Sequence, residues 1–149
     1  MNFPHRIRDP IHGFIRFSNN ERKIIDSPCF LRLRGIRQLA LTNYVYPGAT
    51  HTRFEHSLGV MELATRFFDE LIKNDELIQN TLQTANLSIN EARCLLRGAA
   101  LLHDVGHLPF SHGGEEMLPS GKKHEDVSIA VILSMENMLD DLLFRGAAK

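Results

Sequence analysis

The feature that most constrains the fold of this 149-residue chain is a long amphipathic segment that begins at Thr52. Thr52 and Glu55 have the T-x-x-E spacing of a capping box, in which the two side chains accept backbone N–H groups at the start of a helix. Behind this box, one face recurs at steps of three and four residues. It consists of Phe54, Leu58, Met61, Thr65, Phe68 and Ile72. The pattern predicts a helix with one buried face.

A second capping box, formed by Ser88 and Glu91, predicts another helix further along the chain. We expect Gly106 to end this helix. The residues expected on its inward face are Ala92, Leu95, Ala99 and Leu102. Together the two segments predict a mainly α fold.

Shorter elements complete the predicted fold. Two extended pieces, Arg6–Arg8 and Phe14–Phe17, predict a short N-terminal hairpin. Pro28 suits the first position of a helix, and Phe30, Leu33 and Ile36 follow it at helical spacing. The remaining expectations are a loop over 42–49, a polar helix over 75–85 and a final helix over 125–144. The face expected on the final helix is Val127, Val131, Ser134, Met138 and Leu142.

The composition is that of an ordinary globular protein. Hydrophobic residues make up 43% and charged residues 23% of the chain, which argues against disordered and fibrous classes. No apolar run approaches the roughly 20 residues of a membrane span. Cys29 and Cys94 form no C-x-x-C pair. We therefore expect a single domain over 1–149, no membrane contact, no secretory signal and a cytoplasmic location.

The charge is divided unevenly along the chain. Residues 1–40 carry eight basic and three acidic side chains, and the rest carries nine basic and fifteen acidic ones. A basic N-terminal part favours a partner rich in phosphate, either a nucleotide or a nucleic acid. A solvated arginine-rich face is the other reading of the same pattern.

Six of the eight histidines lie between residues 51 and 124. His103-Asp104 follows a nearly uncharged helical run, where a carboxylate is costly to bury unless it is paired or binds a cation. His56 lies one turn into the other apolar helix. Two helices can bring His56, His103 and Asp104 to one metal ion, since imidazole and carboxylate are suitable ligands. Two core histidines and a capping aspartate are the alternative.

The residues after this pair favour the metal site. His107 and His112 lie in a glycine-rich stretch, and Lys122-Lys123-His124-Glu125 follows at a helix start. Imidazoles donate protons to phosphate leaving groups near neutral pH, and cations and helix N-termini suit phosphate oxygens. This combination indicates metal-assisted phosphoester hydrolysis. A pH-sensitive surface loop is the alternative.

Several longer strings resemble one family, the HD-domain phosphohydrolases. The similarity is to the branch of deoxynucleoside triphosphate triphosphohydrolases related to the mammalian SAM-and-HD-domain enzyme. It runs in order from about residue 6 to residue 132. The matching strings are Asp9–Gly13, Ile25–Pro28, Phe30–Arg34, Tyr46–His51, Arg53–Val60 and His103–His112. The resemblance implies an HD-domain helical bundle.

The resemblance also implies roles for individual residues. His56, His103 and Asp104 match ligands of a divalent metal (Fe, Mn, Zn or Mg). The residues that match groups holding phosphate, generating the attacking water or protonating the leaving group are His107, His112, His124 and Glu125. Arg53 matches a phosphate-contacting arginine, and Gln38 and Leu39 match the sugar side of the pocket. The implied reaction releases deoxynucleoside and triphosphate from a dNTP.

Two positions depart from the family within the matching region. Asp26 and Arg34 match residues that bind an activating nucleotide, but Leu31 replaces the glutamine that reads its base. A leucine side chain makes no amide hydrogen bonds to a guanine. Glu115 stands where the mammalian-type enzyme has an aspartate, and it keeps the charge with a longer reach.

The family pattern extends beyond the matching region. Its fourth metal ligand, an aspartate, lies further downstream, and Asp140 and Asp141 follow His124 too closely to be its obvious equivalents. We therefore expect the chain to be the N-terminal part of a longer enzyme and to self-associate as its relatives do. The alternative function is a catalytically inactive module that binds nucleotides or single-stranded nucleic acid.

Overall fold

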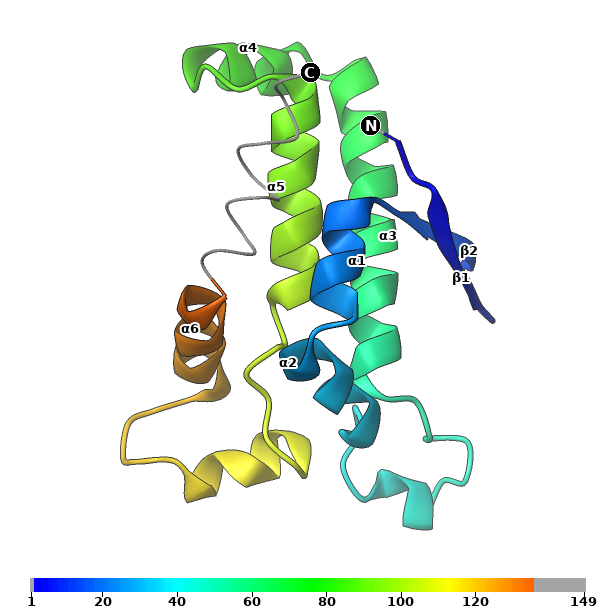
Figure 1. The fold of residues 1–149 in the computed structure, drawn as a ribbon, viewed down its shortest axis with the longest axis vertical. Coiled ribbons are helices and arrows are strands. Elements are labelled where there is room, and N and C mark those ends of the chain that lie inside the picture. The colour runs from blue at the N-terminus through cyan, green and yellow to red at the C-terminus, as the bar shows by residue number, and fades with distance from the viewer. Residues whose placement is uncertain (1, 136–149) are drawn as a thin grey trace.

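The computed structural model describes residues 2–135, which begin with a β-hairpin (Figure 1). Strands β1 (His5–Asp9) and β2 (Gly13–Phe17) pair antiparallel, with Ile7 opposite Ile15. The Asp9 carboxylate accepts the backbone N–H groups of Ile11 and His12, at 2.8 Å each. Gly13 has a φ of +77°, a conformation that suits glycine. The predicted hairpin is confirmed, and it extends slightly further than expected.

Two short helices follow the hairpin. Helix α1 (Asn19–Ile25) begins with a capping box between Ser18 and Glu21. Helix α2 (Pro28–Leu31) has Pro28 in its first turn, as predicted, and the Ser27 side chain accepts the N–H of Phe30. The chain then tightens into the 3₁₀ helix η1 (Arg32–Gly35). Phe30, Leu33 and Ile36 are all buried, although Ile36 already lies in extended backbone.

The centre of the fold is an antiparallel pair of helices, α3 (Arg53–Asn74) and α5 (Ile89–Leu102) (Figure 1). Helix α4 (Glu76–Thr84) joins them at one end. Both predicted capping boxes, Thr52 with Glu55 and Ser88 with Glu91, are formed. Because the pair is antiparallel, the beginning of α3 and the end of α5 lie at the same end of the bundle. This end carries the candidate site.

The inward face predicted for α5 was partly wrong. Ala92 and Leu102 are buried, but Leu95 is 40% exposed and Ala99 is also exposed. The buried face instead includes Arg97, whose Nε donates to Glu21 Oε1 at 2.5 Å. Arg97 also donates to Thr65 Oγ1 at 2.7 Å and to the carbonyl of Arg16 at 2.8 Å. Since a paired arginine takes an inward position, the buried stripe is rotated from the one that an apolar pattern indicates.

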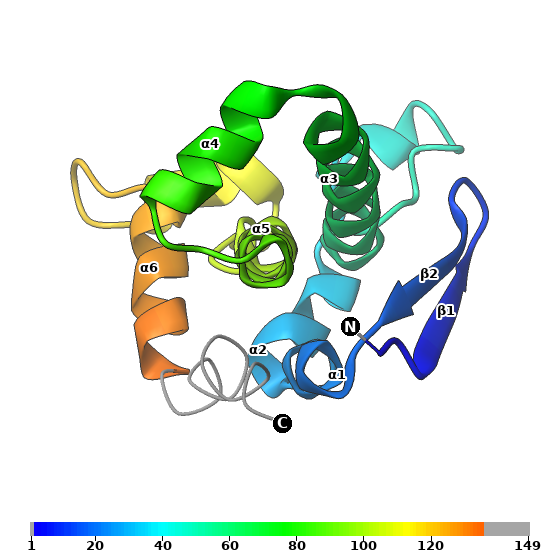
Figure 2. The same cartoon turned by 90° about the horizontal axis from the view of Figure 1, so that it is seen from above.

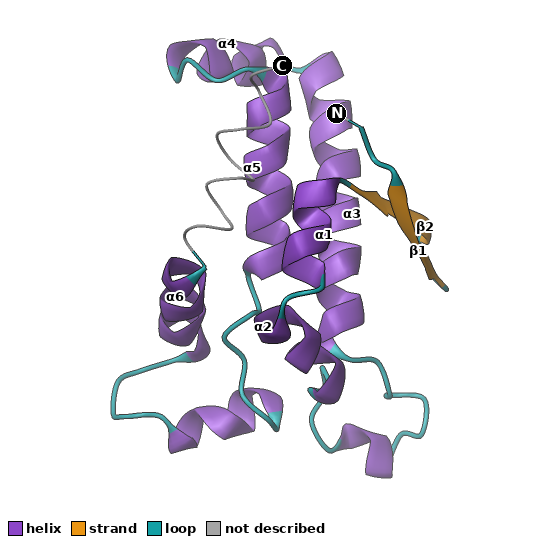
Figure 3. Ribbon diagram, in the orientation of Figure 1, coloured by secondary structure: helices purple, strands orange, loops and turns teal. Residues whose placement is uncertain are grey.

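The end of α5 also differs from the prediction. The helix ends at Leu102, with His103 as its C-cap, and the chain turns through residues 103–106 instead of continuing helically to Gly106. The 3₁₀ helices η2 (Thr42–Tyr44) and η3 (Ser111–Met117) lie within the loops (Figure 3). Helix α6 (His124–Ser134) follows η3.

Helix α6 confirms the start of the predicted final helix to within one residue. Val127 and Val131 are partly buried, whereas Ser134 is exposed, so Ser134 was wrongly placed on the inward face. Met138, Asp140, Asp141 and Leu142 lie outside the described residues.

The core lies between the central helix pair and the N-terminal elements. Seen from above, the hairpin flanks α3 and α6 flanks α5 (Figure 2). Most buried core residues come from β2, α1, α2, η1, α3, α5 and the turn after α5, and include Ile15, Ile24, Phe30, Leu33, Met61, Leu101 and Val105. Met135, the C-cap of α6, also belongs to this core. Within residues 2–135, no helix combines the length and apolar character that crossing a membrane requires. The fold is mainly α with one small hairpin, as predicted.

Candidate active site

The central helix pair brings His56, His103 and Asp104 together. His56 lies one turn inside α3, and His103-Asp104 directly follows α5. The Nε2 atoms of the two histidines are 3.3 Å apart. Asp104 Oδ2 lies 3.6 Å from His56 Nε2 and 3.4 Å from His103 Nε2. One ligand atom from each residue lies within 4.8 Å of the others, as the predicted metal site requires.

These three side chains fit a divalent metal ion by the chemistry of their donor atoms. Two imidazole nitrogens and a carboxylate oxygen suit iron, manganese or zinc. His103 Nδ1 lies 2.8 Å from the carbonyl oxygen of Ala100. When Nδ1–H donates to this carbonyl, Nε2 keeps its lone pair for a metal ion. A hydrogen bond from the other ring nitrogen to a carbonyl is the usual second contact of a metal-binding histidine. The facing Nε2 atoms then favour a cation between them.

Asp104 is buried and surrounded by donors. Arg53 Nη1 donates to Asp104 Oδ2 at 2.5 Å, and His107 Nε2 lies 3.4 Å from Asp104 Oδ1. Burial by itself would raise the pKa of Asp104. The hydrogen bonds from His107 and Arg53, together with the charges of His103 and Arg53, outweigh burial and hold this pKa well below its usual range. The side chain is therefore a carboxylate at neutral pH.

Burial has the opposite consequence for two nearby histidines. It is the main cause that lowers the pKa of His56, against the opposing charge of Asp104. Burial also lowers the pKa of His107, against its hydrogen bond with Asp104. Since only a neutral imidazole has a lone pair to offer, both shifts keep these rings available as ligands or proton acceptors.

A second cluster of histidines lies against this group. His107 follows α5, His112 and Glu115 lie in η3, and His124 begins α6. Glu115 Oε1 lies 2.8 Å from His112 Nδ1 and 2.6 Å from His124 Nδ1. The rings of His107 and His124 stack with their centroids 3.7 Å apart. We refer to His107, His112, Glu115 and His124 as the histidine–glutamate cluster.

Gly106 allows α6 to approach the turn that carries these residues. A Cβ atom at position 106 would lie 2.2 Å from the backbone nitrogen of Ser128 and 2.3 Å from the carbonyl oxygen of His124. The Gly106 N–H donates to Ser128 Oγ at 2.9 Å, and Ser128 Oγ donates to the carbonyl of His103 at 3.2 Å. Gly106 is therefore a contact point between helices, and not the helix terminator that we predicted.

Arg32 fixes the same turn from the other side. Its Nη1 donates to the carbonyl of His107 at 2.6 Å, and its Nη2 donates to the carbonyl of Val105. Arg32 belongs to η1, so these bonds tie the N-terminal part of the chain to the turn between His103 and His107. Burial lowers the pKa of Arg32, against the charge of Cys29.

Arg53 lies in the site, but both terminal nitrogens of its guanidinium donate within the protein. Besides the bond to Asp104, its Nη2 donates to Ser111 Oγ, and the side chain is buried. Its direct contact with phosphate stays a prediction. Ser111 has a φ of 58° and the preceding Phe110 a φ of 68°, so two consecutive non-glycine residues adopt the left-handed conformation at this loop.

The other predicted substrate residues lie around the cluster at different depths. Ser111 Oγ donates to the main-chain carbonyl of Gln38 at 3.3 Å, while Gln38 Oε1 is buried without a hydrogen-bond partner among residues 2–135. Leu39 is exposed. The side chain of Glu125 is 63% exposed, with Oε2 3.4 Å from His124 Nδ1. Gln38 thus joins the site through Ser111, and Glu125 lies at its edge.

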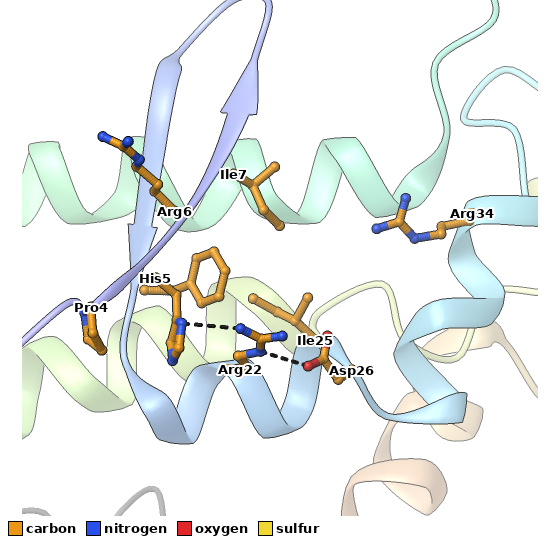
Figure 4. Close-up of a pocket in the computed structure, with 9 residues that line it drawn as sticks. Pro4, His5, Arg6, Ile7, Arg22, Ile25, Asp26 and Arg34 are labelled. Atoms are coloured by element: carbon orange, nitrogen blue, oxygen red, sulfur yellow. Dashed lines mark hydrogen bonds and ion pairs between the residues drawn. The ribbon is translucent and has the colours of Figure 1, made fainter.

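Asp26 and Arg34 line a separate pocket between the hairpin and α1 (Figure 4). Its volume is about 360 Å³, and its walls include four basic side chains, His5, Arg6, Arg22 and Arg34. Arg22 Nε donates to Asp26 Oδ2 at 2.9 Å, and its Nη1 lies 3.2 Å from His5 Nδ1. The pair predicted to bind an activator therefore lies in one pocket. Leu31 does not line it.

Sequence reasoning missed three residues that hold the site. Ser111, Arg32 and Ser128 act through hydrogen bonds to residues far away in the chain, which no local spacing indicates. Position 111 offers the only local signal, because it lies between His107 and His112.

Comparisons with known proteins agree with this geometry. Residues 53–143 match the HD domain family, a span that includes both groups of candidate ligands. The chain is 48% identical over 106 residues to deoxynucleoside triphosphate triphosphohydrolase SAMHD1 of Bos taurus, covering 71% of this chain and 17% of that protein. It is 37% identical over 131 residues to the SAMHD1 homolog of Dictyostelium discoideum, covering 85% of this chain and 24% of that protein.

The chain spans about a fifth of the length of these curated relatives. Its fold also matches the crystal structure of a hypothetical protein from Aquifex aeolicus, with a TM-score of 0.71 and 38% identity. That match covers 92% of this chain and 33% of the other. With a family match over more than half of its length, and with the paired histidine and aspartate at the end of its central helices, this chain belongs to the HD-domain family.

Proposed function

We propose that this chain forms the active-site part of a metal-dependent phosphohydrolase that hydrolyses dNTPs to deoxynucleoside and triphosphate. One observation carries the proposal: the ligand atoms of His56, His103 and Asp104 lie within 4.8 Å of one another, directly beside the histidine–glutamate cluster. The similarity to proteins named deoxynucleoside triphosphate triphosphohydrolases supports the substrate class.

The chain supplies both the metal ligands and the proton-transfer groups of this reaction. His56, His103 and Asp104 would hold the divalent ion, which when bound polarises phosphate oxygens and makes water a better nucleophile. When Glu115 accepts the Nδ1–H groups of His112 and His124, each ring has its Nε2 free to exchange a proton with substrate. His112 is 70% exposed, so we assign proton donation to the leaving oxygen to this residue.

The remaining predicted residues have supporting roles in the proposal. Glu115 orients both rings, because its Oε1 contacts each of them. His107 points its Nε2 at the Asp104 carboxylate, to which it donates a proton in a hydrogen bond, and its ring stacks on that of His124. Gln38 and Leu39 form the sugar side, where Gln38 Oε1 has no partner within the described residues.

Metal analysis and product identification test the proposal. Purified chain loaded with Mn²⁺ or Fe²⁺ should release triphosphate, and not phosphate or pyrophosphate, from dNTPs. His103→Ala should lose both the bound metal and hydrolysis. The matched control is His51→Ala, which removes an exposed histidine outside both ligand groups and should retain both properties. Full hydrolysis by His103→Ala would contradict the proposal.

The basic pocket supports a second function, the binding of a nucleotide that is not hydrolysed. A volume of about 360 Å³ is within the usual range for small-ligand sites, and its histidine and three arginines suit phosphate. On this reading the chain binds nucleotide or single-stranded nucleic acid without turnover. Binding should weaken with salt and with Arg34→Ala. Turnover of a dNTP by the metal-loaded chain would exclude the inactive reading, while leaving the pocket as an activator site.

A further inference from the structure

We propose that the outer face of α3 is a self-association surface, on which α3 of a second copy of this chain packs antiparallel. Three apolar side chains form the centre of this surface. Leu63, Phe67 and Leu71 are 49%, 70% and 43% exposed within the part of the chain that the structure describes. We refer to these three residues as the α3 stripe. The stripe shares no residue with the candidate metal ligands or with the basic pocket.

The α3 stripe lies on the side of the helix that faces away from the core. Its members follow one another at steps of four residues, which places them on one face of a helix. Phe67 comes nine residues after the buried Leu58, and at about 3.6 residues per turn this spacing puts the two side chains on opposite sides. Helix α5 and the N-terminal helices lie on the inner side of α3 (Figure 2). The stripe is therefore a second apolar face, of the kind that marks protein–protein contacts.

The α3 stripe is symmetrical about Phe67, as a surface that contacts its own copy in a closed dimer has to be. Leu63 precedes Phe67 by four residues, and Leu71 follows it by four. In an antiparallel pair centred on Phe67, Leu63 of each copy therefore faces Leu71 of the other, and the two Phe67 rings meet at the centre. The stripe is about 12 Å long at a rise of about 1.5 Å per residue.

A row of charged side chains borders the stripe along one side. In chain order the row consists of Glu62, Arg66, Glu70 and Lys73, so acidic and basic groups alternate. Within one copy, Arg66 Nε lies 2.8 Å from Glu62 Oε1, and Lys73 Nζ lies 2.9 Å from Glu70 Oε1. The side chains of Arg66, Glu70 and Lys73 are nevertheless more than half exposed. They are therefore accessible to a second helix that lies along the stripe.

Antiparallel pairing about the centre of the stripe brings unlike charges together along this whole row. Arg66 of one copy lies beside Glu70 of the other, and Glu62 lies beside Lys73. The two-fold axis repeats each of these contacts. Parallel pairing in register would instead place each charge beside the same charge of the other copy, which is repulsive. Charges that flank an apolar stripe set the partner and the orientation of paired helices, and here they select a second copy in the antiparallel orientation.

The extent of the surface sets the expected strength of the dimer. Stable interfaces bury about 800 Å² on each partner, and a stripe of three side chains with one charged border is smaller than this. We therefore expect a weak dimer whose population depends on protein concentration. Its affinity should fall as salt is added, because salt screens exposed charge pairs.

Sedimentation velocity over a wide range of protein concentrations, in the presence of a chelator, tests the surface. Wild-type protein should be a monomer at the lowest concentrations and a dimer at the highest. Phe67→Glu should remain a monomer throughout, because it places two like charges at the two-fold axis. The matched control is Tyr44→Glu, which makes the same change at an aromatic side chain that is 82% exposed and belongs to η2. This control should dimerise as wild-type protein does.

Exchange of the charges tests the orientation. Arg66→Glu and Glu70→Arg should each dimerise more weakly than wild-type protein, since each places like charges beside one another in its own dimer. An equimolar mixture of the two variants should recover the dimer, because one variant then supplies only acidic groups and the other only basic groups at these contacts. Far-UV circular dichroism verifies that each variant is folded.

Three outcomes would overturn the proposal. The first is wild-type protein that is monomeric at every concentration. The second is a Phe67→Glu protein that dimerises as wild-type protein does, or a dimer that Tyr44→Glu abolishes and Phe67→Glu does not. The third is a mixture of Arg66→Glu and Glu70→Arg that dimerises no better than either variant alone.

Discussion

Arg53 Nη1 lies 2.5 Å from Asp104 Oδ2, and both side chains are buried. The first residue of α3 thus supplies the counter-charge for the carboxylate that follows α5. A buried charge that loses its partner is strongly destabilising, because no solvent replaces the lost interaction. This ion pair therefore links α3 to the turn after α5, and it also keeps the candidate metal ligand Asp104 negatively charged.

Arg53→Met should lower the free energy of unfolding of the metal-free protein by about 3–5 kcal/mol. The matched control is Arg22→Met, which breaks an exposed arginine–aspartate pair with Asp26 and should cost less than about 1 kcal/mol. Urea unfolding followed by circular dichroism measures both changes. Equal losses in the two variants would show that burial of the Arg53–Asp104 pair does not set its contribution.

Gly106→Ala should destabilise the protein by about 1–3 kcal/mol or prevent folding, because overpacked contacts force the backbone to move. The added Cβ would lie 2.2 Å from the backbone nitrogen of Ser128, an atom of α6 that has no freedom to move alone. Gly48→Ala is the control, since a Cβ at that position meets no atom of the described part of the chain within 4 Å. Thermal unfolding gives the comparison. A Gly106→Ala protein as stable as Gly48→Ala would mean that α6 does not pack against this turn in solution.

The stability of the metal-free protein should fall as the pH falls from about 7.5 to 5. Burial lowers the pKa of both His56 and His107 in the folded state. The unfolded chain, with histidine pKa values near 6.5, therefore takes up protons first. Their contribution is fully present above about pH 6.5 and is lost as the pH falls below this value. Asp104, whose pKa is also lowered, adds a further loss only below about pH 4.

Urea unfolding at a series of pH values in the presence of a chelator measures this dependence. His107→Gln should have a shallower slope between pH 7 and 5 than wild-type protein, because one of the two shifted groups is removed. A wild-type stability that rises or stays level over this interval contradicts the prediction.

Local patterns were sufficient to predict the elements that depend on neighbouring residues. The capping boxes at Thr52 and Ser88, the hairpin and the apolar face of α3 all rest on spacings of a few residues, and all are present. The same helices placed His56, His103 and Asp104 at one end of the bundle. This part of the site follows from two helix ends and their antiparallel pairing.

The wrong predictions concern residues whose burial or hydrogen bonds depend on a partner that is distant in the sequence. The inward face of α5 was misplaced because Arg97 is buried there. Its guanidinium donates hydrogen bonds to Glu21, a residue 76 positions away in the chain. The local sequence predicts that Gly106 ends a helix. In the structure, its missing side chain instead allows the backbone of α6 to approach closely. Likewise, the pattern predicts a phosphate contact for Arg53, and only the fold shows the bonds to Asp104 and Ser111.

Arg32 provides the last prediction, because it links η1 to the turn that carries His107. Its guanidinium donates to the carbonyls of Val105 and His107, and hydrogen bonds from a charged donor contribute about 1.5–3 kcal/mol each. Arg32→Ala should lower the free energy of unfolding by about 2–4 kcal/mol and weaken metal binding, since the turn also holds His103 and Asp104. Arg37→Ala is the matched control: its guanidinium donates to one carbonyl, that of Thr50, at 3.3 Å at an exposed position.

Urea unfolding and competition of bound Co²⁺ with a chelator measure the two effects of each arginine variant. Arg32→Ala should lower both the free energy of unfolding and the affinity for metal, whereas Arg37→Ala should change either by little. Arg32→Lys should recover only part of each, because a lysine ammonium does not reproduce the fixed fork with which a guanidinium reaches two carbonyls. If Arg32→Ala binds metal as tightly as wild-type protein, the turn holds the ligands without help from η1.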